Sequence, residues 1–399
     1  MIAIIGGGPA GLMAAEVLAR AGRSVTLYER MPSLGRKFLM AGRGGLNLTH
    51  SEPLLVFLKR YGAAEPNLAP LIETFTPDAL RTWSAGLGQE TFIGSSGRVF
   101  PQAFKASPLL RAWLRRLESL GVSVRLRHEW QGWTDQGALL FESPDGPVEV
   151  MSEAVILALG GASWHRLGSD GSWVSLLAAR GIDLMPFRPA NCGFRVNWSE
   201  HLVERFAGVP LKPLGLSFGA VRLRGEAMIT ALGIEGGGIY ALSAALRDAI
   251  ESEGSATLHI DLIPDRSLAD VSNKLSAPRR AQSLSSFLKR VLGLSPVAIA
   301  LMREVDRHPP EDPDALAALL KHLPIRLTAT QPIARAISSA GGISLTEVTA
   351  DLMLQKLPGV FVAGEMLDWE APTGGYLLQA SFSTGVAAAE GVLRWLDSA

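Results

Sequence analysis

The chain has almost no cysteine. Among its 399 residues Cys192 is the only one. A single cysteine excludes an intramolecular disulfide, a C-x-x-C redox pair and a thiolate metal cluster. The seven histidines are scattered, and none stands at a metal-ligand spacing from another histidine or from an acid. The sequence therefore predicts no metal site and no chemistry that relays electrons through a disulfide.

An excess of charge of either sign is also absent. Lys plus Arg and Asp plus Glu both number 38. This balance removes any whole-protein electrostatic reason to expect nucleic acid or an anionic membrane as a partner, and it leaves a small molecule by default. No apolar run approaches the roughly 18 residues that would span a bilayer. The apolar first 19 residues lack a basic segment and contain a glycine turn, so we expect a cytoplasmic protein.

The sequence is rich in apolar residues, 47% against 19% charged, as in a well-packed globular protein. Its length favours two or three domains. The most informative segment is the first: MIAIIGGGPAG is a short apolar strand followed by Gly6-x-Gly8-x-x-Gly11. A helix to Ala21 and a second strand, SVTLYE, ending at Glu29 come next.

This strand, turn, helix, strand and acid sequence predicts a dinucleotide site. Gly6 permits the tight turn, Gly8 lets a pyrophosphate approach the backbone, and Gly11 allows close packing of helix on strand. The helix N-terminus supplies N–H groups for the phosphates, and Glu29 stands near the spacing of a carboxylate that accepts hydrogen bonds from ribose hydroxyls. The alternative is a glycine-rich turn in some other α/β protein.

A second glycine-rich stretch, LGRKFLMAGRGGLNLTH, covers residues 34–50. Its exposed backbone N–H groups, with Arg36, Lys37 and Arg43 beside them, would suit a second grip on a diphosphate or on flavin oxygens. The alternative here is a solvated basic loop.

The middle of the chain predicts an excursion from the first domain. Residues 52–120 are expected to be mostly helical, and residues 122–133 alternate as one strand of a β-meander that continues through 138–143 and turns at 144–147. AVILALGG, from Ala154 to Gly161, is a buried strand that we place beside the first one, with its terminal glycines at the sheet edge where ligands bind. It could also be an ordinary core strand with a tight turn.

Residues 188–330 break the α/β pattern and predict an insert. Strands dominate 188–264 and helices dominate 265–330. The final segment then resembles the first: 357–365 is a buried strand that ends in Gly364 and Glu365, and a glycine-rich turn leads into a long Ala-rich helix from Tyr376. We therefore predict a discontinuous nucleotide-binding domain, 1–187 with 331–399. The N-terminus of the last helix would face the flavin N1 and C2 carbonyl, where negative charge gathers on reduction.

These motifs together resemble the YhiN/BaiN-like flavoproteins, a family of FAD-dependent oxidoreductases. The similarity runs nearly end to end, through GGGPAG, the Gly-Arg-Lys loop, LALGGASWHRLGSDGSW, LGIEGGGIYALS and G-E-x-x-D-x-x-x-P-T-G-G-Y. The resemblance implies an α/β Rossmann-like FAD domain of the two-dinucleotide-binding type, with a β-barrel-like unit and a small helical unit inserted. It also implies FAD contacts at Gly6, Gly8, Pro9, Ala10, Gly11, Glu29, Arg30, Gly35, Arg36, Lys37, Gly42, Asn47, Trp130 (through its backbone), Gly160, Gly161, Gly364, Glu365, Asp368, Gly374, Gly375 and Tyr376.

The sequence departs from the family pattern at two positions. Leu46 stands where most members have a cysteine, so chemistry that needs that thiol is absent. His165 replaces an expected proline and is a candidate proton donor near the flavin. The second catalytic candidate is Arg43, although a solvated or structural role is the common one for loop residues.

The predicted function is that of an FAD-dependent oxidoreductase with noncovalent flavin. NADH, NADPH or the substrate would reduce the flavin, and a second small molecule, bound between the FAD domain and the insert, would reoxidise it. The glycines of 232–238 lead from an antiparallel region and are rejected as a nicotinamide site, so NAD(P)H would bind transiently. The alternatives are a flavin-dependent RNA-modifying enzyme and a noncatalytic FAD-bound regulator.

Overall fold

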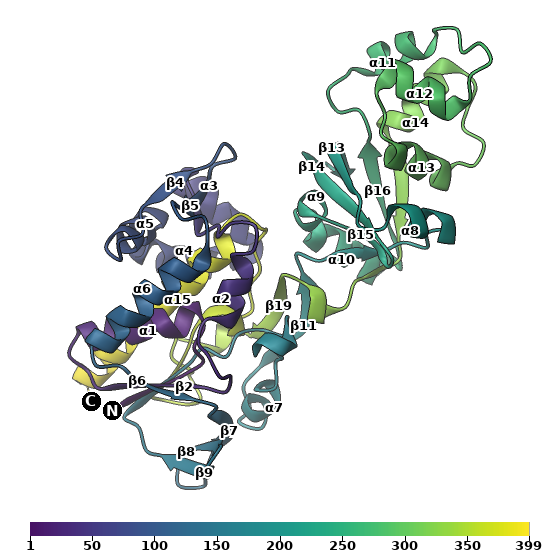
Figure 1. The fold of residues 1–399 in the computed structure, drawn as a ribbon. Helices are drawn as coiled ribbons and strands as arrows, with labels where there is room; N and C mark the ends of the chain where they lie inside the picture. The colour runs from purple at the N-terminus through teal and green to yellow at the C-terminus, as the bar shows by residue number, and fades with distance from the viewer. Residues whose placement is uncertain (399) are drawn as a thin grey trace. The chain divides into compact units, whose positions relative to one another are not determined.

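The computed structural model describes residues 1–398 (Figure 1). The chain divides into two compact units, residues 1–188 with 338–399 and residues 189–337. The predicted return to the first domain at 331 lies seven residues before the observed boundary. Residues 331–337 stay with the insert because the N–H groups of Gln331 and Ile337 bond to the carbonyls of Gly193 and Asn191.

A five-stranded parallel sheet forms the centre of the first unit. Its order is β20 (Val360–Val362), β10 (Ala154–Leu157), β1 (Ile2–Ile5), β2 (Val25–Glu29) and β6 (Ser123–Leu126). Ile2 lies opposite Ala154 on one side and Val25 on the other. The predicted neighbourhood of the 154–161 strand and the first strand is confirmed. β1 and β10 are buried at every residue, as parallel strands covered on both faces must be.

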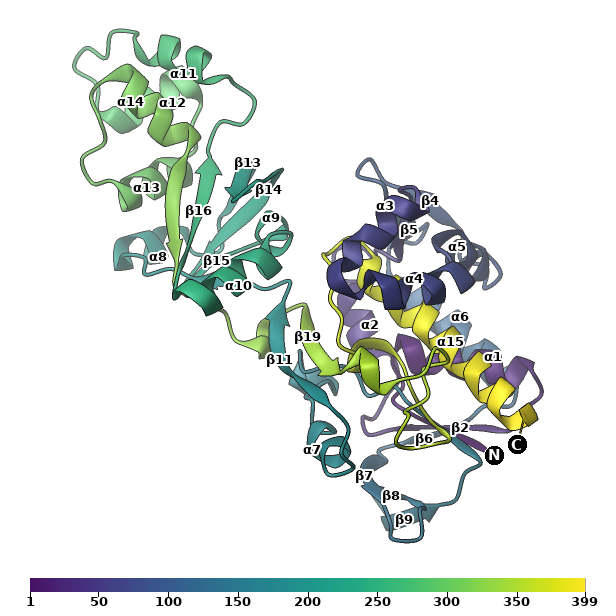
Figure 2. The ribbon, with the colours of Figure 1, turned by 180° about the vertical axis from the view of Figure 1, so that it is seen from behind.

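Helices α1 (Pro9–Arg20), α6 (Ala106–Ser119) and α15 (Tyr376–Ser398) lie along one side of this sheet in both ribbon views (Figures 1 and 2). The first and last helices cross closely, since a Cβ added to Gly385 would lie 2.4 Å from the carbonyl oxygen of Ala10. The two ends of the chain thus build one domain.

The segment 122–133, predicted as one strand, is two strands in two different sheets. Arg127 has a φ of 58°, and this left-handed residue ends β6 and turns the chain. The next strand, β7 (Glu129–Trp133), forms a separate antiparallel meander with β8 (Leu139–Ser143) and β9 (Gly146–Val150). The predicted meander is present, but β6 belongs to the parallel sheet.

Residues 52–120 are mostly helical, as predicted, with α3 (Leu54–Leu58), α4 (Glu65–Thr74), α5 (Pro77–Ala85) and α6. Two short strands that the pattern did not predict, β4 (Thr91–Ile93) and β5 (Arg98–Pro101), pair with each other and with β3 (Thr49–His50). Short α2 (Arg36–Ala41) follows the first unit's second strand. The two-residue β3 holds the end of the glycine-rich stretch in place.

The second unit contains a seven-stranded antiparallel sheet. The order is β17 (Leu323–Leu327), β16 (Ala256–Asp261), β13 (Pro210–Phe218), β14 (Val221–Thr230), β15 (Gly233–Glu235), β12 (Phe194–Arg195) and β18 (Ala329–Thr330). The glycines of 232–238 lie on antiparallel β15 and at the start of α9 (Gly237–Tyr240). They do not form a strand-turn-helix phosphate site.

Helices fill the rest of this unit. They are α8 (Glu200–Phe206), α10 (Ser243–Glu253), α11 (Leu268–Leu275), α12 (Leu284–Leu292), α13 (Pro296–Val305) and α14 (Pro313–Lys321). Ser199, Ser267, Ser283, Ser295 and Asp312 cap five of them through side-chain oxygens that accept backbone N–H groups. Within residues 1–398 no helix is both long enough and apolar enough to cross a membrane.

Candidate functional site

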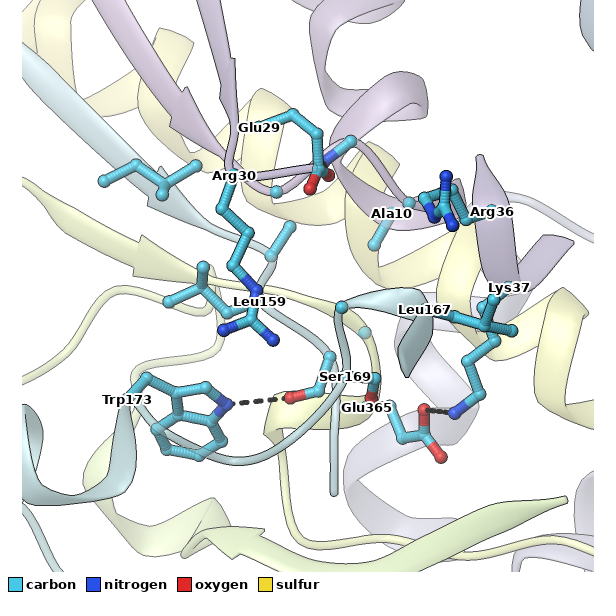
Figure 3. A pocket seen from close by; sticks show the side chains of 18 of the residues that line it. Ala10, Glu29, Arg30, Arg36, Lys37, Leu159, Leu167, Ser169, Trp173 and Glu365 are labelled. Atoms are coloured by element: carbon cyan, nitrogen blue, oxygen red, sulfur yellow. Dashed lines mark hydrogen bonds and ion pairs between the residues drawn. The ribbon is translucent and has the colours of Figure 1, made fainter. Parts of the chain in front are cut away.

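A pocket opens at the carboxyl ends of β1, β2, β10 and β20, and all of its lining lies in the first unit (Figure 3). Parallel α/β sheets bind ligands at this edge. The pocket brings together thirteen of the residues predicted to contact FAD: Gly6, Gly8, Pro9, Ala10, Glu29, Arg30, Gly35, Arg36, Lys37, Trp130, Gly160, Gly364 and Glu365.

The three glycines of the first turn meet different surroundings. A Cβ on Gly6, whose φ is 111°, would lie 2.2 Å from the carbonyl oxygen of Ala158, and one on Gly11 would lie 2.0 Å from that of Gly6. A Cβ on Gly8 would meet nothing within 4 Å. Gly6 and Gly11 are therefore required by packing, whereas Gly8 leaves bare backbone beside the pocket that it lines.

Gly8 is also the N-cap of α1, and no side chain caps that end. The first N–H groups of a helix have no partner within the helix, and they carry the positive end of its dipole. An uncapped helix start that opens on a pocket is suited to a phosphate.

Glu29 lies at the end of β2, beside the glycine turn. One carboxylate oxygen accepts the N–H of Gly7 at 2.8 Å, and the other accepts the N–H of Met31 at 2.8 Å. Burial raises the pKa of Glu29, although the two N–H groups and the nearby guanidinium groups of Arg30 and Arg36 act in the opposite direction. Each oxygen keeps a free lone pair, so the carboxylate can accept further hydrogen bonds from a ligand.

Arg30 joins two walls of the pocket. Its guanidinium lies 2.8 Å from a carboxylate oxygen of Asp170 and 3.3 Å from one of Glu129. Burial alone would raise the pKa of Asp170, but the hydrogen bonds from Arg30 and Ser172 outweigh burial and lower it. Asp170 is thus an anion that ties the 160–173 loop to the end of β2.

A second ion pair closes the pocket near α2. Lys37 Nζ lies 2.6 Å from a carboxylate oxygen of Glu365 and 2.7 Å from the hydroxyl of Ser163 (Figure 3 shows the ion pair). The other oxygen of Glu365 accepts the N–H of Ser339 at 2.9 Å. Lys37 and Glu365 are 27% and 15% exposed, so the pair is shielded from most solvent. It connects α2, the loop after β10, β19 (Ser338–Ile343) and the turn after β20.

Two buried donors of pocket-lining residues have no hydrogen-bond partner in residues 1–398. They are Nε of Arg36 and the indole Nε1 of Trp130. Buried donors are nearly always satisfied in folded proteins. Both belong to residues of the pocket wall, and the described residues leave these two donors unsatisfied.

Comparison with known proteins agrees with this geometry. The family described as HI0933-like protein Rossmann domain matches residues 1–391. The chain belongs to this family. The resemblance predicted from the sequence motifs is thereby confirmed, and so is the Rossmann-type α/β fold.

The relatives of this chain include enzymes whose names indicate different substrates. It is 26% identical to the 3-dehydro-bile acid delta(4,6)-reductase of Clostridium scindens, over 97% of both chains. It is 23% identical to the ribosomal RNA dihydrouridine synthase of Escherichia coli, over 98% of this chain and 97% of the relative. The Haemophilus influenzae protein of the same name is 22% identical, over 98% of both.

Two solved structures share the fold. The 3-ketosteroid delta1-dehydrogenase of Sterolibacterium denitrificans matches with a TM-score of 0.55 and 12% identity, over 98% of this chain and 99% of that one. The 3-ketosteroid-delta4-(5alpha)-dehydrogenase of Rhodococcus jostii RHA1 matches with a TM-score of 0.52 and 16% identity, over 98% and 95%. At these identities the likeness concerns the fold alone.

Several pocket residues were not predicted from the sequence. The main group lies in the loop of residues 167–173, where the indole N–H of Trp173 bonds to the carbonyl of Gly160 at 2.9 Å and the Ser169 hydroxyl bonds to that of Gly161 at 3.0 Å. GSDGSW was part of the predicted family pattern, and its two glycines, Gly168 and Gly171, were the sequence signal for a tight loop. Both have a positive φ in the structure.

Some predicted contacts lie outside the pocket. They are Gly11, Gly42, Asn47, Gly161, Asp368, Gly374, Gly375 and Tyr376. Gly42 and Gly161 are explained by packing, because added Cβ atoms would lie 2.5 Å from Ala106 Cβ and 1.9 Å from Ser339 Oγ. Asp368 accepts the N–H of Gly341 at 3.1 Å, and burial raises its pKa.

Apart from Gly11, which packs against Gly6, the remaining members of this set form a second group around β3: Asn47, Gly374, Gly375 and Tyr376. A Cβ on Gly375 would lie 2.5 Å from Thr49 Cα, and the Asn47 amide donates to the carbonyl of Thr49 at 2.8 Å. The Tyr376 hydroxyl donates to Glu52 at 2.6 Å, and burial followed by this bond raises its pKa. The start of α15 and the end of the 34–50 stretch are therefore in contact. This contact is consistent with the prediction that both segments bind the same FAD molecule.

The two catalytic candidates lie outside the pocket lining. Nε2 of His165 is 2.9 Å from the carbonyl oxygen of Ala162, in its own loop. Arg43 is exposed, and its side chain makes no ion pair or hydrogen bond in residues 1–398. Leu46, at the position of the family cysteine, is fully buried.

Proposed function

We propose that this chain is an FAD-dependent oxidoreductase that adds hydrogen across a carbon–carbon double bond conjugated to a carbonyl group. The observation that carries the proposal is the meeting of three glycine-bearing strand ends, after β1, β10 and β20, beside the carboxylate that ends β2. This is the arrangement of a dinucleotide site in which no 2'-phosphate is expected.

The residues of the pocket fit FAD. The uncapped start of α1 and bare Gly8 would receive the pyrophosphate, and Glu29 would accept the ribose hydroxyls. Arg36 and Trp130 line the same pocket and would contact the same molecule, Trp130 through its backbone. Bound FAD would supply two-electron redox chemistry.

The protein's own groups would bind and orient. The pair of Lys37 and Glu365 fixes the carboxylate of Glu365 at the turn where the family pattern assigns a cofactor contact. The Arg30 and Asp170 pair holds the 160–173 loop over the opposite wall.

The proposed substrate class follows from what the relatives' names have in common. A delta(4,6)-reductase of a 3-dehydro bile acid and a dihydrouridine synthase both saturate a ring double bond, in a steroid acid and in a uracil ring. An unsaturated apolar small molecule is the first candidate, since the bile-acid enzyme has the higher identity, 26% against 23%. A uracil ring within RNA is the second. NADH or NADPH, bound transiently, would be the electron donor.

His165 would be the proton donor, and Arg43, the other catalytic candidate, would act as a fixed positive charge, since a guanidinium keeps its proton. The His165→Gln variant tests the first, because a general acid lost from the flavin site shifts the pH dependence of kcat. An unchanged pH profile would remove His165 from this role.

Anaerobic spectroscopy tests the proposed function. The purified protein should show the flavin absorbance bands, and NADH or NADPH should bleach them. A conjugated 3-keto steroid acid should restore the bands if the first candidate is right, and a uridine-containing ribosomal RNA fragment should do so if the second is right. A protein that takes up FAD but is bleached by neither nicotinamide would favour the regulator alternative, and a colourless protein would refute the proposal.

A further inference from the structure

The insert contains a hollow of its own, formed within the second unit by α8, α12 and α13 (Figure 1 labels these helices). Its lining combines basic and hydroxyl-bearing side chains with apolar ones, among them Leu202, Phe206 and Ile299. The four lining cations are Arg205, Lys289, Arg303 and Arg307. We call this group the basic hollow.

The four cations of the basic hollow are not neutralised. All are exposed, and within residues 1–398 none forms an ion pair. Many other basic side chains of this protein are paired, for example Arg224 with Asp265. The hollow's one acid, Glu304, is already engaged, because its two oxygens accept the N–H and the hydroxyl of Ser199 at 2.6 and 2.7 Å.

A long stretch of the sequence that contributes to the basic hollow carries charged residues of one sign only. Residues 271–303 contain no Asp or Glu, whereas they contain six basic residues, Lys274, Arg279, Arg280, Lys289, Arg290 and Arg303. This stretch runs from α11 through α12 to the last turn of α13. The equal totals of the whole chain conceal it, so the absence of a net charge does not describe this surface.

The extent of this charge bears on the size of the ligand. Arg279 and Arg280 lie in the loop before α12, and Arg290 lies on α12 itself, so basic groups continue beyond the hollow along the same elements. A small anion would be held by buried donors around one point. Exposed Lys and Arg side chains without an acidic partner, spread over neighbouring elements, suit a chain of phosphates, which they neutralise one by one.

We propose that the basic hollow binds the phosphodiester backbone of a nucleic acid. The contacts would be to phosphates, so they would set affinity and position and carry no base sequence. Ser285 and Ser286, which also line the hollow, would add hydroxyl donors to the phosphate oxygens. Binding at this surface requires no flavin chemistry.

Two triple variants of the full-length, FAD-loaded chain test the proposal. One removes three cations of the basic hollow, Arg205→Gln, Lys289→Gln and Arg303→Gln. The matched control removes Lys105, Arg111 and Arg115, which are exposed and form no ion pair in the described part of the first unit. Both triples replace two Arg and one Lys, so they change the net charge equally.

The readout is fluorescence anisotropy of a labelled single-stranded RNA of about 20 nucleotides, titrated at several salt concentrations from about 50 mM upward. Losing three phosphate contacts should flatten the slope of log K against log salt by about 2 and weaken binding about 100-fold at 0.1 M salt. The control triple should bind as the unaltered chain does. Flavin absorbance and the melting temperature verify that both variants are folded.

The proposal is overturned if the unaltered chain binds no RNA at about 50 mM salt, or if the two triple variants lose the same RNA affinity. It is also overturned if tripolyphosphate displaces the RNA at equal phosphate concentration, because the hollow would then be a site for small anions. A DNA strand of the same sequence is run in parallel. Equal affinity for RNA and DNA supports backbone contacts, and binding of neither opposes them. Failure of this test leaves flavin reduction by NAD(P)H intact, so it is distinguishable from failure of the proposed function.

Discussion

The contrast between Gly8 and Gly11 yields the sharpest prediction. Both glycines belong to the glycine-rich turn after β1, and the test replaces each of them separately by alanine. In the Gly8→Ala variant the new methyl group meets nothing within 4 Å of the protein. In the Gly11→Ala variant it lies 2.0 Å from the carbonyl oxygen of Gly6. If Gly8 serves a ligand and Gly11 serves packing, the two variants must fail in different ways.

The magnitudes follow from these distances. Gly8 has a φ of −86° and a ψ of −176°, which alanine adopts freely. Alanine is a poorer N-cap than glycine by up to about 1 kcal/mol. It also restricts the unfolded chain, which raises the free energy of unfolding by about 0.4–1 kcal/mol. The free energy of unfolding without FAD should therefore change by less than about 1 kcal/mol. The methyl group would displace two charge-assisted hydrogen bonds to the pyrophosphate, which lowers FAD affinity by about 3 kcal/mol or about 100-fold.

The assay combines urea unfolding of the FAD-free proteins with fluorescence titration of FAD. Gly11→Ala should lower the free energy of unfolding by about 2 kcal/mol or more, because overpacking against backbone is poorly relieved. Gly8→Ala should keep its unfolding free energy and lose FAD affinity. A Gly8→Ala protein that binds FAD normally, or that unfolds as readily as Gly11→Ala, would refute the assignment of Gly8 to the pyrophosphate.

Three further variants probe the walls of the pocket. Lys37→Met leaves the carboxylate of Glu365 without its cation and should cost about 1–2 kcal/mol in urea unfolding, discounted for partial exposure; a Lys37→Arg variant as unstable as Lys37→Met would contradict a charge-pair role. Asp170→Asn should cost about 0.5–1 kcal/mol at neutral pH. Arg30 lowers the pKa of Asp170, so this stability is fully present above the unfolded value of 3.8 and is lost as pH falls through the lowered value of the folded protein. The difference between the two proteins should therefore shrink in acid, and a difference independent of pH would oppose this explanation. Trp173→Phe loses one hydrogen bond, which contributes about 1 kcal/mol. Calorimetry should show a lower FAD affinity and a melting temperature that shifts by only a few degrees. An unaltered FAD affinity would mean that Trp173 is not part of the site.

The fold of the first unit was largely readable from the sequence because its signals are local. A fully apolar strand, a glycine turn and an Ala-rich helix follow one another within 20 residues, and the same order recurs at the end of the chain. The exception, the strand pair β6 and β7, depended on a single left-handed residue, Arg127. Arginine rarely adopts that conformation, so alternation alone predicted one continuous strand.

The site was predicted in part for a related reason. Residues on glycine turns, such as Gly8 and Gly364, can be predicted from their residue type and their spacing in the sequence. Residues of the 167–173 loop reach the pocket only through contacts that span the fold, such as the bond of Trp173 to Gly160 and the ion pair of Asp170 with Arg30. Long-range pairing of this kind leaves no periodic trace in one sequence.

The charge balance illustrates a different limit of sequence totals. Totals of 38 basic and 38 acidic residues disfavoured a nucleic acid partner, yet the acid-free stretch 271–303 lies within the same chain. Electrostatic binding depends on local surface charge, which a sum over all residues does not record. The distribution of acids along the sequence was the signal that would have found the basic hollow.

The most direct test of the central inference is a titration of the FAD-free chain with FAD, followed by flavin fluorescence and by calorimetry. We predict saturation at one FAD per chain, weakened about 100-fold by Gly8→Ala in a protein that remains folded. A folded chain that takes up no FAD would contradict the assignment of the pocket and, with it, the oxidoreductase function.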